Sequence, residues 1–131
     1  YIKKIQIESR VMGDLALNHI LPAAVKYQTS LAKNIEALQD IGLGAEMYET
    51  QMGQIREISG HIMSIMKNVE AMVEARKKAN KVDSVRERAI MYCENVKSFF
   101  DVIREHADKL EMLVDDEVWP MAKYRELVNV R

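Results

Sequence analysis

The chain has 131 residues, of which 48% are hydrophobic and 30% charged, with only two prolines and five glycines. This length indicates a single domain with a real core, and the composition favours helices over strands or disorder. Nineteen basic and twenty acidic residues leave a net charge of −1, so neither nucleic acid nor an anionic membrane surface is an expected partner. One cysteine, with no signal peptide or membrane span in the sequence, favours the cytoplasm.

The apolar spacing predicts a first helix over residues 2–40. Pro22 lies in its interior, where it lacks an amide proton and clashes with the carbonyl of Asn18, so we expect a kink or a break there. Gly42 and Gly44 end this helix and reverse the chain. Because the chain begins at Tyr1 inside an already helical pattern, we expect it to be an excised piece of a larger protein.

A second helix, predicted over residues 46–80, carries the seam that organises the fold. Its apolar residues recur at alternating gaps of three and four, which is a heptad pattern. They are Ile55, Ile58, Ile62, Ile65, Val69 and Met72. Facing stripes are expected on both neighbouring helices: Leu31, Ile35 and Leu38 before it, and Ala89, Cys93, Val96, Phe100, Ile103, Ala107, Leu110 and Val114 after it.

The third helix is predicted to begin at Ser84, because Ser84 and Glu87 form a capping box, and to run to about residue 116. It should stop before Trp119 and Pro120, since a proline disfavours helical geometry in the residue before it. The predicted fold is therefore all-α: an elongated antiparallel bundle of three long helices, forming one domain over residues 1–131.

No residue is predicted to be catalytic, to bind a cofactor or to bind a metal. None of the three histidines has a glutamate three residues before it, which is the pairing that di-iron helical bundles use. Cys93 occupies a seam position, so we interpret it as a small buried hydrophobe rather than a nucleophile. His61 and His106 fall beside seam positions, where an imidazole commonly packs its ring and satisfies one nitrogen.

A docking surface is the one candidate site. Arg10, Asp14 and Asn18 repeat every four residues among apolar neighbours, so they either form a hydrogen-bond network between helices or dock against another domain. Gly53 and Gly60 lie seven residues apart on the face opposite the seam, and each costs about 1 kcal/mol relative to alanine in a helix. Either the helix tolerates them, or a neighbour approaches that face closely.

Three stretches resemble one known family in the same order. Residues 8–28 read ESRVMGDLALNHILPAAVKYQ, residues 74–80 read EARKKAN, and residues 110–128 read LEMLVDDEVWPMAKYRELV. They resemble the C-terminal region of the type III glutamine synthetases, the long-chain bacterial class. The resemblance covers nearly the whole chain and is weakest over residues 31–56.

The resemblance implies a parent ligase that joins glutamate and ammonia with ATP and a divalent metal such as Mg²⁺, in a large ring-shaped homo-oligomer. No residue of this chain matches the family's catalytic or metal-binding motifs, which lie in an upstream domain. The segment would then be a structural or docking domain whose partners are its own catalytic domain and neighbouring subunits. The alternative is a free-standing coiled-coil interaction module with a chance likeness.

Overall fold

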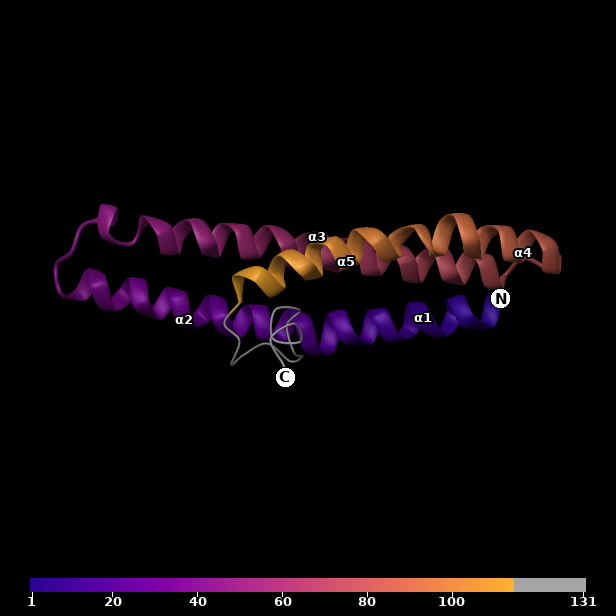
Figure 1. Cartoon of the computed structure of the whole chain (residues 1–131), viewed down its shortest axis with the longest axis horizontal. Helices are drawn as coiled ribbons and strands as arrows, with labels where there is room; N and C mark the ends of the chain where they lie inside the picture. The colour runs from indigo at the N-terminus through magenta and orange to yellow at the C-terminus, as the bar shows by residue number, and fades with distance from the viewer. Residues whose placement is uncertain (115–131) are drawn as a thin grey trace, which may run out of the picture.

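The computed structural model describes residues 1–114, and every regular element in that part of the chain is helical. The predicted all-α class is confirmed. Figure 1 shows three helical runs lying along one another as an elongated rod, with the chain reversing its direction at each end. The described part of the third run ends short of the turn between α2 and α3, so this run does not reach that end of the rod.

The first run consists of α1 (Ile2–Leu15), a π-helical turn η1 (Ala16–Ile20) and α2 (Leu21–Asp40). In this turn the Leu21 amide donates to the carbonyl of Ala16, five residues back instead of four. The wider turn directly precedes Pro22, whose ring and missing amide proton would disrupt the regular α-helical bond to residue 18. The helix is therefore interrupted in its hydrogen bonding near Pro22 without being broken, and the kink itself stays a prediction.

The first reversal is built by the predicted glycine turn. Gly42 has a φ of +88°, a conformation that glycine adopts without strain, and the Leu43 amide donates to the carbonyl of Leu38 at 3.1 Å. A 3₁₀ turn, η2 (Ala45–Met47), follows before α3 (Glu49–Asn80) begins. The central helix thus starts three residues later than residue 46, where its beginning was predicted.

The third run consists of α4 (Val85–Met91), a second π-helical turn η3 (Tyr92–Val96) and α5 (Ser98–Leu113). The Ser84 hydroxyl caps its start by accepting from the Glu87 amide at 3.4 Å, so the predicted start is confirmed. The predicted end near residue 116, Trp119 and Pro120 and the tail all lie outside the described residues.

The interpretation of Cys93 as a buried seam residue is wrong, since its side chain is exposed. The π-helical turn inserts one residue into the apolar spacing, and Tyr92 takes the inward position with none of its surface exposed. Its hydroxyl donates to Asn80 and accepts from Gln6 Nε2 at 2.9 Å. One buried tyrosine therefore links all three helical runs.

The core follows the predicted seam of α3, where Ile58, Ile65, Val69 and Met72 are buried. Both α2 and α5 pack on this helix. The buried residues of the third run are Tyr92, Val96, Phe100, Ile103, Leu110 and Val114. Toward the turn between α2 and α3 the burial thins: Ile35 is buried, but Leu31, Leu38 and Ile55 are only half-buried. The core is therefore concentrated where three helices meet.

Candidate docking surface

The outward side of α1 and η1 carries large apolar residues beside the predicted polar column. Ile7, Val11 and Leu17 are 54%, 60% and 43% exposed. At 100° per residue they share one helical face with the polar column, opposite the buried residues Ile5 and Ala16. We call Ile7, Arg10, Val11, Asp14, Leu17 and Asn18 the α1 outer face.

The polar column makes bonds within its own helix only. The Asn18 amide donates to Asp14 Oδ1 at 2.6 Å, and His19 Nε2 lies 3.8 Å from Asp14 Oδ2. Arg10 is exposed, and its guanidinium makes no ion pair or hydrogen bond with the described residues. Within residues 1–114, these side chains therefore do not form the hydrogen-bond network between helices that the sequence left open.

Gly53 and Gly60 lie on the outward side of α3. Both are exposed, and a Cβ atom added at either position would meet no atom within 4 Å. Met63 follows Gly60 by three residues on the same side and is 71% exposed. No contact in the described part of the chain requires glycine at these two positions. Either a neighbour outside this part approaches them closely, or the helix merely tolerates them.

The structure does not bring the polar column of α1 and the two glycines of α3 together. Gln28 of α2 donates to the carbonyl of Ile55 and to Ser59, so Gly53 and Gly60 lie at the level of α2. A Cβ atom added at Gly13 of α1 would lie 3.9 Å from Val69, which is nine residues beyond Gly60 along α3. The predicted docking residues are therefore two separate surfaces at different levels of the rod.

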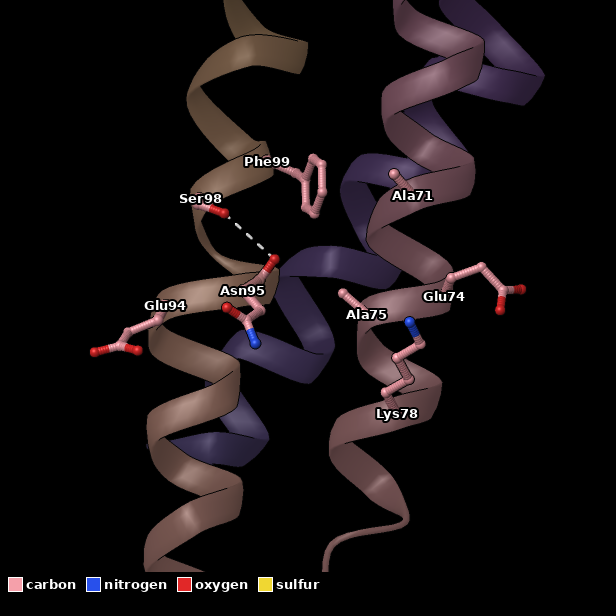
Figure 2. A pocket seen from close by; sticks show the side chains of 8 residues that line it. All are labelled: Ala71, Glu74, Ala75, Lys78, Glu94, Asn95, Ser98 and Phe99. Atoms are coloured by element: carbon pink, nitrogen blue, oxygen red, sulfur yellow. Dashed lines mark hydrogen bonds between the residues drawn. The ribbon is translucent and has the colours of Figure 1, made fainter.

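A shallow groove also lies between α3 and the third run. Figure 2 shows Phe99 directed into the space between the helices, across from the small side chains of Ala71 and Ala75, while Glu74 and Glu94 point away to either side. The groove has a volume of about 470 Å³. Lys78, Asn95 and Ser98 complete its lining. Sequence patterning missed this groove because the π-helical turn sets the rotation of the third run against α3.

Two histidines meet between α3 and α5, which the sequence did not predict although it placed both beside the seam. Their Nδ1 atoms are 2.9 Å apart, and the Nε2 atom of His61 is buried without a hydrogen-bond partner. Glu57 Oε1 lies 3.8 Å from that atom, which is too far for a hydrogen bond. Burial and, to a smaller extent, the neighbouring His61 lower the pKa of His106.

Other chemistry has little basis in the described residues. Residues 1–114 contain no group of three or more His, Cys, Asp or Glu side chains placed to hold a metal ion, so they do not fit the divalent metal of a ligase. Cys93 is exposed beside Tyr1, and its hydrogen bond raises the pKa of the Tyr1 hydroxyl. None of the helices in this part of the chain is both long and apolar enough to cross a bilayer.

Comparison with known proteins identifies the class of protein to which this helical rod is similar. Residues 1–39 match the family model described as the glutamine synthetase C-terminal domain. The matched part contains α1, η1 and nearly all of α2, and therefore the whole α1 outer face. The predicted resemblance to the C-terminal region of the glutamine synthetases is confirmed.

Two particular relatives extend the similarity to the whole chain. A glutamine synthetase of Bacteroides fragilis is 46% identical over 132 residues, which is 98% of this chain and 18% of the relative. A type-3 glutamine synthetase of Dictyostelium discoideum is 24% identical over 138 residues, covering 100% of this chain and 18% of that protein. The chain thus spans less than a fifth of the length of either relative.

Proposed function

We propose that this chain is the C-terminal helical docking and oligomerisation domain of a glutamine synthetase. The observation that carries the proposal is the similarity over 98% of this chain to only 18% of a protein named glutamine synthetase. A chance likeness of a free-standing coiled-coil module would not give 46% identity over 98% of the chain. The partners of the domain are the enzyme's own upstream catalytic domain and its neighbouring subunits.

In this proposal the parent enzyme is a cytoplasmic glutamate–ammonia ligase, and the 131-residue segment performs no catalysis. ATP and Mg²⁺ are expected to bind in the upstream catalytic domain of the parent. The contribution of the segment is mechanical: a rigid rod with two outward surfaces holds other parts of the assembly. The apolar exposure of the α1 outer face supports this role, since burying it against a neighbour would recover hydrophobic free energy.

The glycine surface of α3 gives a direct test in the full-length enzyme. We expect Gly53→Leu with Gly60→Leu to weaken assembly, measured by light scattering, because bulky side chains would prevent close approach of a neighbour. The isolated segment should become at least as helical as before, since open space surrounds both positions and leucine favours helix over glycine by about 1 kcal/mol at most.

Alanine at the same two positions is the matched control. It raises helix propensity about as much as leucine does, with far less bulk, so it separates helix stabilisation from steric exclusion. Assembly should survive the alanine pair. If the leucine pair leaves both oligomer size and activity unchanged, the glycines are merely tolerated and this surface is not a docking site.

A further inference from the structure

A small apolar pocket lies between the first helical run and α5. It has a volume of about 140 Å³, and its lining consists of the exposed Arg104 and six apolar residues. The six are Met12, Leu15, Ala16, Ile20, Ile103 and Ala107. Ala16, Ile20 and Ile103 are buried and form its floor. Because an apolar cavity of about 150 Å³ accepts a ring the size of benzene, this pocket fits one aromatic side chain.

The end of α5 brings the chain close to this pocket. Val114, the residue that follows α5, is 2% exposed and has an extended backbone, with φ −83° and ψ 142°. Ala107 lies seven residues earlier, about 10 Å along the helix, on nearly the same helical face as Val114. Trp119 follows Val114 by five residues, and an extended chain of that length spans up to about 17 Å. The pocket is therefore within reach of Trp119.

We propose that Trp119 fills this pocket and anchors the C-terminal end of the chain between the first run and α5. The indole ring buries its apolar surface there, and its N–H group faces the open side of the pocket, where water accepts its hydrogen bond. The guanidinium of Arg104 meets the face of the ring in a cation–π contact. Such an anchor is independent of the docking role proposed above.

The residues on both sides of this contact favour it. Arg104 lies 3.8 Å from Asp101, but both side chains are exposed, so this ion pair contributes little and leaves the guanidinium available. Pro120 restricts the backbone of Trp119 to extended conformations, so less conformational entropy is lost when the indole binds. Tyr124, the other aromatic residue beyond Val114, has a ring that attracts a cation less strongly than indole does.

Intrinsic fluorescence tests the anchor directly, because Trp119 is the only tryptophan of the chain. In the native chain we expect emission at shorter wavelength than in urea and weak quenching by acrylamide, at every chain concentration. Ala107→Phe places an aromatic ring in the pocket, so the emission should shift to longer wavelength and the quenching should increase. Ala45→Phe is the matched control: it makes the same change beside a separate hollow near the turn between α2 and α3, and should leave the emission unchanged.

Circular dichroism establishes which variants keep the native helicity. The proposal is overturned if a folded Ala107→Phe chain keeps the native emission, or if Ala45→Phe causes the shift instead. Emission that changes on dilution also overturns it, because Trp119 would then bind a second copy of the chain.

Trp119→Ala tests the pocket from the other side, including the case in which Ala107→Phe does not fold. This change vacates the pocket, so the variant should bind free indole in calorimetry, whereas the native chain should not. Equal heats from the two chains, or no heat from either, would show that Trp119 does not occupy the pocket.

Discussion

At the scale of single residues, the contact between His61 and His106 is sensitive to pH. With Nδ1 atoms 2.9 Å apart, one ring must donate and the other must accept, so the hydrogen bond is lost when both rings are fully protonated. Burial lowers the pKa of His106 most, and the His61 ring and Lys109 lower it further. Glu105 acts in the opposite direction and raises it. The neutral form of His106 is therefore the one that the folded chain favours.

This contact predicts that acid weakens the fold. Because the folded pKa of His106 lies below the unfolded value, the unfolded chain binds more protons below about pH 6.5, and stability falls as pH decreases from there through the folded pKa. We expect the free energy of unfolding, from urea titrations, to fall between about pH 7.5 and 5, and His106→Gln to reduce that fall. The exposed His19→Gln is the control and should retain it. Equal pH dependence in the native and His106→Gln proteins would contradict the prediction.

At the scale of elements, the two π-helical turns decide which residues face the core. A heptad pattern extends reliably only while the hydrogen bonds keep α-helical spacing, and each π turn adds one residue to that spacing. The effect is clearest in η3, where the regular spacing points to Cys93 but Tyr92 is buried. The seam of α3 carries no such turn, and there the spacing and the burial agree.

The register of η3 predicts opposite results for these two neighbouring residues. Tyr92→Ala should cost about 3 to 5 kcal/mol of stability in denaturant melts, as truncation of a buried aromatic residue does. Cys93→Ala should change stability by about 0.5 kcal/mol or less, because the side chain is exposed. In the native protein a thiol reagent should modify Cys93 without global unfolding. Protection of Cys93 together with a mild effect of Tyr92→Ala would mean that the uninterrupted heptad was correct.

At the scale of the whole molecule, the described residues form a rod whose core is concentrated where the three helical runs meet. The groove of about 470 Å³ in Figure 2 is shallow, and the lysine and glutamates around it lack the carboxylate cluster that a metal–nucleotide complex needs. Binding chemistry in a rod of this kind depends on its outer faces, which here are apolar and charged in alternation along α1.

We therefore predict that the purified 131-residue chain binds neither ATP nor glutamate and has no ligase activity. Calorimetry with ATP and Mg²⁺, and separately with glutamate, should give no saturable heat at ligand concentrations up to about 1 mM. The full-length enzyme is the positive control in the same titrations. Saturable binding to the segment in the micromolar range would assign it a direct part in the chemistry.

The sequence by itself determined the features that depend on local spacing. The all-α class, the seam of α3, the glycine reversal at Gly42 and the cap at Ser84 all follow from residues within a few positions of one another. The resemblance carried by residues 8–28 likewise pointed to the glutamine synthetases before any fold was known. Local propensity and periodicity are sufficient for such features because each is satisfied within one or two turns of helix.

Only the tertiary structure decided the features that depend on how the helices rotate against one another. The heptad spacing that predicts the buried residues of α3 wrongly predicts that Cys93 is buried. The structure has a π-helical turn there, and it is Tyr92 that points inward and bonds with Gln6 and Asn80 of the other runs. The same holds for the contact of His61 with His106 and for the separation of Gly53 and Gly60 from the α1 outer face. A one-residue insertion rotates a helix by about 100°, which a sequence pattern does not record but side-chain packing must resolve.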